Sequence, residues 1–171
     1  MSNPKRVYWD ACAWIAYIKQ ETVEVDGKKE NRFEMCKSIL KEAEAGKIEI
    51  ATSAFTLAEV CKSPEVKNSA VDNLPSFFDK SYILLIPVDK FVGTRAQAIQ
   101  LAGIYGLKPQ DATHVASAYI AKSAELHTFD GVILSLHQKI TGSDGLPMTI
   151  CKPGEQKPAG PLLEIANGKK K

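Results

Sequence analysis

The sequence predicts an α/β fold, in which helices cover both faces of a central parallel sheet in a three-layer α/β/α arrangement. Short apolar runs typical of strands alternate along the chain with longer segments whose apolar residues recur at helical spacing. Such alternation favours strand–helix–strand units with parallel strands. The run SYILLIPV at residues 81–88 is almost continuously apolar, which indicates a strand covered on both faces.

The N-terminal half is expected to contribute two strands and three helices. In chain order these elements are a strand at 6–9, a helix at 11–20, a polar loop at 21–30, a helix at 31–45, a strand at 48–51 and a helix that continues to residue 62. The first strand ends at Asp10, and Gly46 is placed to stop the second helix. Thr52 or Ser53 is expected to cap the third helix.

The C-terminal half holds the stretch that organises the prediction, residues 109–134. In chain order this half is expected to form a partly helical segment at 65–80, a strand at 81–88, helices at 89–105 and 109–123, a strand at 125–129, a short helix at 132–139 and a last strand at 148–151. Pro109 suits the first turn of its helix, because its missing N–H costs nothing there. That helix carries slim side chains on one face, which suits close packing on a sheet. Asp130-Gly131 is a strong turn signal.

We expect one domain over residues 1–151, followed by a basic tail over residues 152–171. The tail carries five Lys against two Glu, a net charge of +3, whereas residues 1–151 carry 17 Lys or Arg against 18 Asp or Glu, a net charge of −1. The Pro, Gly and Lys content of the tail favours partial disorder. The body is not basic overall, so binding a phosphate backbone requires local patches, the tail or bound cations.

The cysteines and the apolar runs restrict the class of protein. Cys12, Cys36, Cys61 and Cys151 form no C-x-x-C pair, and no His lies at zinc-ligand spacing from them. We therefore expect buried reduced thiols and no structural zinc site. No run approaches the length of a membrane span, and the N-terminus lacks the apolar core of a signal peptide, which favours a cytoplasmic protein.

Four acidic residues are predicted to meet at one edge of the sheet. Asp10 and Asp130 end strands, whereas Glu59 and Asp111 lie early in helices. Ligands of such sheets bind outside the C-terminal ends of the strands, where the helices that follow the strands begin. Each acid alone has a simpler explanation, as a helix cap, a turn residue or an exposed helical acid. Their shared location favours a functional site.

The predicted chemistry of this site follows from its charge. Four bare carboxylates in one small site repel each other, and divalent cations relieve that repulsion. All-oxygen ligands suit Mg²⁺ or Mn²⁺, whereas the lack of paired His or Cys argues against zinc or iron. Such ions could activate a water molecule and neutralise a scissile phosphodiester, so the sequence predicts hydrolysis of a phosphate ester.

Four segments together resemble the PIN-domain family, and within it the VapC-like toxin ribonucleases. They are VYWDACAWIAYI, TSAFTLAEV, DATHVASAY and LHTFDGVIL, spread over most of residues 6–134. The resemblance implies a Mg²⁺- or Mn²⁺-dependent endoribonuclease that is held inactive by an antitoxin protein and forms a homodimer. It places Asp10, Glu59, Asp111 and Asp130 in the catalytic metal site, with Thr128 and Ser53 as supporting residues.

Two departures from the family keep alternatives open. Many members have a hydroxyl residue followed by Asn or Ser after the first Asp, whereas this chain has Ala11-Cys12, and Gly131-Val132 adds no further acid. One alternative is therefore a non-catalytic PIN-like scaffold that binds RNA or protein. A phosphatase ranks lower, because Asp10 is not followed by the second Asp of a D-x-D pair. His114, one turn after Asp111, is expected to pack within the fold; the alternatives are that it orients that carboxylate or contacts RNA.

Overall fold

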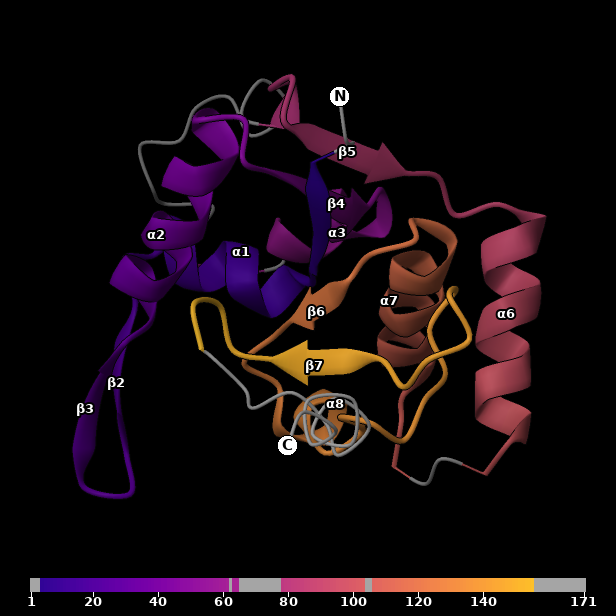
Figure 1. Cartoon of the computed structure of the whole chain (residues 1–171). Coiled ribbons are helices and arrows are strands. Elements are labelled where there is room, and N and C mark those ends of the chain that lie inside the picture. Colours follow the sequence, from indigo (N-terminus) through magenta and orange to yellow (C-terminus); the bar gives the residue numbers. More distant parts are fainter. Residues whose placement is uncertain (1–3, 62, 65–77, 104–105, 156–171) are drawn as a thin grey trace, which may run out of the picture.

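The computed structural model describes residues 4–61, 63–64, 78–103 and 106–155, and its centre is a parallel sheet (Figure 1). The five strands lie in the order β5-β4-β1-β6-β7, and each neighbouring pair is parallel. They are β1 (Lys5–Trp9), β4 (Ile48–Ser53), β5 (Ile83–Ile86), β6 (Glu125–His127) and β7 (Thr149–Cys151). Because β1 lies between β4 and β6, its C-terminal end is at the middle of one edge of the sheet.

Helices cover both faces of this sheet, as the sequence predicts. They are α1 (Ala11–Ile18), α2 (Arg32–Glu44), α3 (Phe55–Val60), α6 (Lys90–Leu101), α7 (Pro109–Ile120) and α8 (Gly131–Leu134). Side chains of α1 and α2 form one core cluster with the sheet, and side chains of α6 and α7 form the other. None of the helices in the described ranges combines the length and the apolar character needed to cross a membrane.

The alternation of side chains along β1 divides the two cores. Val7 and Trp9 belong to the cluster beneath α1 and α2, whereas Tyr8 belongs to the cluster beneath α7. Helix α7 presents Ala112 and Ala116 to the sheet, and both are fully buried. Small side chains let the helix axis approach the sheet closely, which confirms the predicted packing face.

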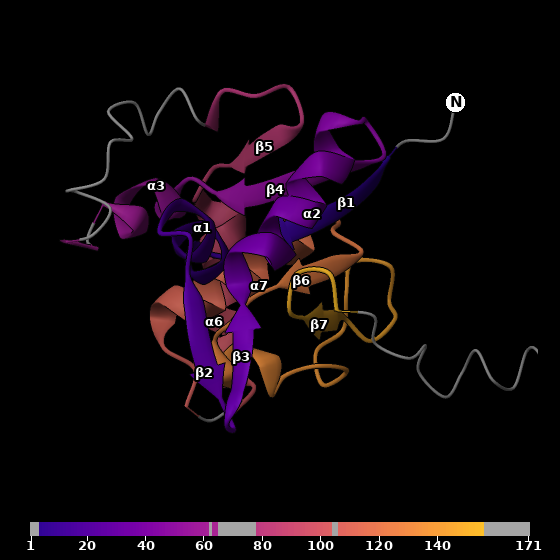
Figure 2. The ribbon, with the colours of Figure 1, turned by 90° about the vertical axis from the view of Figure 1, so that its left-hand side faces the viewer.

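A β-hairpin replaces the loop that the sequence predicts after the first helix. β2 (Thr22–Val25) pairs antiparallel with β3 (Lys28–Asn31), and the hairpin projects from the body of the molecule (Figures 1 and 2). Asp26 and Gly27 form its turn with φ of 52° and 72°, the left-handed conformation that a two-residue hairpin turn requires. The loop prediction is wrong because both strands are short and largely polar, so they lack the apolar alternation of a core strand.

Three other boundaries differ from the prediction. Thr52 and Ser53 are the last residues of β4, and α3 begins only at Phe55. β5 is an edge strand with three half-buried residues of four, so its apolar run is covered less completely than predicted. The short helix at 132–139 is reduced to α8 and a series of turns. Most of the expected helical segment at 65–80 and of the tail, namely residues 65–77 and 156–171, lies outside the described residues.

Candidate active site

Asp10 lies at the C-terminal end of the central strand and is almost completely buried, with 1% of its surface exposed. Its Oδ1 accepts the backbone N–H of Ala13 at 3.0 Å, so the side chain caps α1. Its Oδ2 accepts the hydroxyl of Thr128 at 2.5 Å. Burial raises the pKa of the Asp10 carboxyl above its ordinary value, although the nearby His114 and the two hydrogen bonds oppose that rise. The residue is therefore a helix cap and also a buried carboxylate that a cation would stabilise.

Asp130 follows β6, the strand beside β1, and caps the next helix. Its Oδ1 accepts the N–H groups of Val132 and Ile133 at 2.8 and 3.0 Å. Its own N–H donates to the hydroxyl of Thr128 at 2.9 Å. Thr128 thus contacts both acids.

Glu59 projects from α3 and meets a histidine of α7. Its Oε2 lies 2.6 Å from His114 Nε2, and the other ring nitrogen of His114 lies 2.8 Å from the hydroxyl of Tyr8. His114 is 3% exposed and Tyr8 is fully buried. His114 therefore contacts Glu59 and not the neighbouring Asp111, and it reaches the acidic site from inside the core.

Asp111 lies in the first turn of α7, where its Oδ2 accepts the N–H of Lys108 at 3.2 Å. Burial raises the pKa of its carboxyl, and the charge of Asp130 raises it further. The carboxylate at the start of α7 is therefore close enough to Asp130 for the two charges to interact.

The charges of all four acids act on the thiol of Cys12. Burial raises the pKa of this thiol, and the charges of Asp10, Asp130, Glu59 and Asp111 each add to the rise. Cys12 and Cys61 are exposed, whereas Cys36 and Cys151 are buried, so the expectation of buried thiols holds for two of the four cysteines. Cys12 is the second residue of α1, two positions after Asp10.

Ser53 contacts none of the four acids directly. Its hydroxyl accepts the N–H of Phe55 at 3.2 Å and so supports the start of α3, the helix that carries Glu59. Its own N–H donates to the Tyr8 hydroxyl at 3.1 Å. Ser53 is therefore linked to Glu59 in two ways. It supports the start of α3, and it is hydrogen-bonded to Tyr8, which contacts His114.

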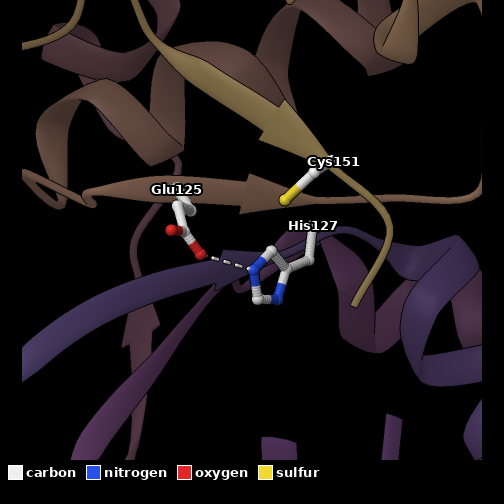
Figure 3. Close-up of side chains that lie close together, drawn as sticks. All are labelled: Glu125, His127 and Cys151. Carbon is white, nitrogen blue, oxygen red and sulfur yellow. Dashed lines mark hydrogen bonds and ion pairs between the residues drawn. The ribbon is translucent and has the colours of Figure 1, made fainter. Parts of the chain in front are cut away.

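A second group of possible metal ligands lies on the opposite side of the sheet from α7. The ligand atoms of Glu125, His127 and Cys151 lie within 4.8 Å of one another, beside a cavity of about 450 Å³ (Figure 3). His127 and Cys151 face each other on the paired strands β6 and β7. Because they come from separate strands, the spacing of Cys and His in the sequence could not reveal the group. Among the described residues, the acidic site itself forms no set of three ligand atoms this compact.

Hydrogen bonds within this second group oppose metal binding. Trp9 Nε1 can only donate, so its 3.2 Å contact makes His127 Nδ1 an acceptor and leaves the ring proton on Nε2. That proton faces Glu125 Oε2 at 3.0 Å, and Glu125 Oε1 forms an ion pair with Lys5 at 2.5 Å. A metal at Nδ1 would have to displace the N–H of Trp9, and a metal at Nε2 would have to displace the ring proton that faces Glu125. The group is best described as a satisfied hydrogen-bond network.

The family of the chain follows from the match of its sequence to the PIN domain over residues 7–136. The chain belongs to the PIN-domain family. The matched range includes the C-terminal part of β1, the whole of α7 and all four acids, so the four acids lie within the PIN domain. No curated protein matches the chain at a significant level.

Two solved structures are similar to this chain at low sequence identity. VapC20 of Mycobacterium tuberculosis, a toxin that cleaves the sarcin–ricin loop, is 17% identical with a TM-score of 0.51, over 75% of this chain and 93% of its own. A chain of a toxin–antitoxin complex from Klebsiella pneumoniae is 18% identical with a TM-score of 0.49, over 75% of this chain and 90% of its own. At such identity the likeness to VapC20 concerns the fold.

The donor set of the acidic site fits a hard divalent cation. Its side chains offer carboxylate oxygens, which Mg²⁺ and Mn²⁺ prefer, and Mg²⁺ typically binds through few carboxylates while keeping several waters. Burial raises the pKa of both Asp10 and Asp111, so a cation would relieve the cost of ionising them. Asp10, Glu59, Asp111 and Asp130 are the residues that could hold it.

Sequence reasoning missed the roles of Tyr8 and His114. The strand pattern indicates that Tyr8 points to the same face as α7, and His114 lies on the buried side of that helix. The sequence pattern does not indicate that α3 lies close to α7, so it could not reveal the contact between Glu59 and His114. Only the tertiary structure joins these three residues.

Proposed function

We propose that the protein is a Mg²⁺- or Mn²⁺-dependent endoribonuclease that hydrolyses RNA phosphodiester bonds at the acidic site. The observation that carries the proposal is the contact of Asp10 and Asp130 with the one hydroxyl of Thr128 at the C-terminal edge of the sheet, where the charges of Asp111 and Glu59 also act. Membership of the PIN-domain family and the fold shared with the toxin VapC20 support it.

Each acid has a distinct part in the proposed reaction. Asp10, Asp111 and Asp130 hold the cation, and Glu59 binds it or orients the attacking water. Thr128 holds the side chain of Asp10 and the backbone N–H of Asp130 by hydrogen bonds. A bound divalent cation supplies a more acidic water and offsets the negative charge of the phosphodiester. The carboxylates are pre-organised by helix capping and by hydrogen bonds, so little reorganisation is needed when the substrate binds.

We also propose that the protein is the toxin of a toxin–antitoxin pair, acts in the cytoplasm and forms a homodimer. The support is the fold shared with VapC20, which is a toxin, together with the family. A partner that covers the acidic edge would exclude RNA from it.

The test is cleavage of a structured RNA pool by the purified protein with Mg²⁺, with Mn²⁺ and with EDTA. Asp10→Asn is compared with Asp26→Asn, which makes the same chemical change in the exposed turn of the hairpin. We expect metal-dependent cleavage by the wild type and by Asp26→Asn, and none by Asp10→Asn. Equal cleavage by the two variants, or cleavage that persists in EDTA, would contradict the proposal.

The alternative is a non-catalytic scaffold that binds RNA or protein. The observation that favours it is the hydrogen bonding of both Asp10 oxygens within the protein, which leaves this carboxylate partly satisfied without a cation. Absence of cleavage together with absence of Mn²⁺ uptake in a calorimetric titration would support the scaffold.

A further inference from the structure

A chain of hydrogen bonds runs from the core of the sheet to the acidic site. It starts at the N–H of Ser53, passes through the hydroxyl of Tyr8 and the ring of His114, and ends at the carboxylate of Glu59. The three contacts measure 3.1, 2.8 and 2.6 Å. Tyr8 and His114 are buried in the core, Ser53 ends β4, and Glu59 is the member of this series that belongs to the four acids.

When Glu59 is ionised and the ring of His114 is neutral, only one placement of the protons satisfies this series of hydrogen bonds. A carboxylate only accepts, so His114 Nε2 carries a proton and donates it to Oε2. In a neutral ring the other nitrogen, Nδ1, then accepts the hydroxyl proton of Tyr8. The Tyr8 oxygen in turn accepts the N–H of Ser53. Both ring nitrogens of His114 and the hydroxyl of Tyr8 are thereby paired, which matters because these two side chains are buried.

The ring of His114 is also held in place by its neighbours. The Tyr8 ring meets it edge-on with centroids 6.0 Å apart, and the Phe55 ring lies 6.2 Å away on the helix that carries Glu59. The ring therefore has little freedom to turn away from Glu59. Oε2 of Glu59 is fixed by His114, and Oε1 remains for another partner.

We propose that His114, fixed by Tyr8, is a positioning residue that holds Glu59 so that its second oxygen faces the cation site. The inference rests on the proposed function, since it takes Glu59 to be a ligand of the cation or of its water. His114 itself is buried and touches neither RNA nor cation. Hydrogen-bond partners that orient metal-binding carboxylates typically contribute about 10- to 100-fold to metal affinity or activity.

The main experiment measures Mn²⁺ affinity by calorimetry, which does not depend on any RNA. The variants are His114→Ala, His114→Gln, Glu59→Gln and the double variant His114→Ala/Glu59→Gln. His137→Ala is the matched control, because His137 accepts the N–H of Ile150 outside the acidic site. Thermal unfolding without metal is recorded for each variant, so that a loss of affinity is separated from a loss of stability.

We expect His114→Ala to weaken Mn²⁺ binding about 10- to 100-fold and His114→Gln, which keeps an amide donor, to restore most of it. In the Glu59→Gln background the change at position 114 should have no further effect, and His137→Ala should bind Mn²⁺ as the wild type does. In RNA cleavage, His114→Ala should raise the Mn²⁺ concentration needed for half-maximal rate and leave the KM for RNA unchanged.

Two results would overturn the inference: wild-type Mn²⁺ affinity in His114→Ala, or an equal loss of affinity with and without Glu59. If His114→Ala does not fold, Tyr8→Phe decides, because it keeps the aromatic ring and removes the hydroxyl. Weakened Mn²⁺ binding by that variant supports the inference, and unchanged binding overturns it. Mn²⁺ uptake by a wild type that cleaves no RNA would refute the ribonuclease and leave the positioning role intact.

Discussion

The hydroxyl of Thr128 donates a hydrogen bond to Asp10 Oδ2 at 2.5 Å, and the oxygen of that hydroxyl accepts the N–H of Asp130 at 2.9 Å. Thr128 is fully buried at the end of β6, next to the central strand β1. One side chain therefore ties together two acids that are 120 residues apart in the sequence. This contact sets the distance between the ends of β1 and β6, where the acidic site begins.

Replacing Thr128 by Val should disturb both acids at once. Val has nearly the same shape but cannot donate to Asp10 or accept from Asp130, so a buried carboxylate loses a partner and an N–H is left unpaired. We expect the free energy of unfolding to fall by about 1–3 kcal/mol, as measured by urea denaturation. RNA cleavage should fall by about 10- to 100-fold. Thr128→Ser keeps the hydroxyl and should retain most of both properties, and a Val variant as stable and active as Ser would refute the role.

Asp10 should cost stability at neutral pH when no metal is bound. Burial raises the pKa of its carboxyl above the ordinary value of 3.8, so the folded state binds the proton more tightly than the unfolded chain. The stability due to that proton is present below pH 3.8 and is lost as the pH rises through the folded-state pKa. In EDTA at pH 7, Asp10→Asn should therefore be more stable than the wild type, by about 1 kcal/mol or about 2–4 °C in Tm.

The difference between Asp10→Asn and the wild type should depend on pH and on metal. It should shrink as the pH falls towards 4, because the wild-type carboxyl then takes up its proton. Added Mg²⁺ should stabilise the wild type and not the variant, since a cation stabilises only the state that binds it. An Asn variant that is less stable at pH 7 in EDTA would mean that the hydrogen bonds to Ala13 and Thr128 outweigh the cost of burial.

Most of the fold could be predicted because its core elements carry strong local signals. Helix α7 begins at Pro109 and packs slim residues on the sheet, and β1 ends at Asp10, as the patterns of charge, Pro and apolar spacing indicate. The hairpin β2–β3 could not be predicted in this way. Its strands pair with each other outside the main sheet, so no core imposes an apolar alternation on them.

The four acids of the proposed site could be selected from the sequence, but the contacts that hold them could not. Acids at strand ends and helix starts reveal the edge of a parallel sheet, since the topology brings those positions together. The Glu59–His114 contact and the Glu125–His127–Cys151 group depend on which strands and helices become neighbours. Side-chain pairs of this kind lie far apart in sequence and leave no local pattern.

The close packing of α7 on the sheet predicts a strong effect of side-chain volume. Ala116 is fully buried on the face of α7 that meets the sheet. Ala116→Leu should lower the free energy of unfolding by about 1–3 kcal/mol through overpacking, and it should shift Asp111 at the start of the same helix. The matched change Ala98→Leu falls on an exposed position of α6 and should leave stability nearly unchanged. Equal urea midpoints for the two variants would contradict the close approach of α7.

The second group of possible ligands should not bind zinc. Trp9 and Lys5 already satisfy His127 and Glu125, so Zn²⁺ would have to break a buried hydrogen bond and an exposed ion pair. We expect Zn²⁺ to raise the Tm of the wild type and of Cys151→Ser by the same amount, if it raises either. A stabilisation by Zn²⁺ that Cys151→Ser abolishes would show that this group binds the metal after all.

Glu125 should stabilise the fold in a pH range that its pKa defines. The hydrogen bond from His127 lowers the pKa of its carboxyl from 4.5 to about 2, with a further contribution from Lys5, although burial opposes the shift. A lowered pKa in the folded state means that the stabilisation is complete above pH 4.5 and is lost as the pH falls towards 2. At pH 7, Glu125→Gln should therefore lower the free energy of unfolding by about 1–2 kcal/mol.

Urea denaturation of wild type and Glu125→Gln between pH 7 and pH 3 measures this contribution. The difference between the two proteins should be constant down to about pH 5 and should narrow below that, as the unfolded chain begins to protonate its Glu residues. Glu34→Gln is the matched control, because Glu34 pairs with Lys37 on the exposed side of α2. Its effect should stay within about 0.5 kcal/mol throughout, as is usual for an exposed pair. A difference at Glu125 that is equally small at pH 7 would mean that the contacts with His127 and Lys5 only offset the cost of burying the carboxylate.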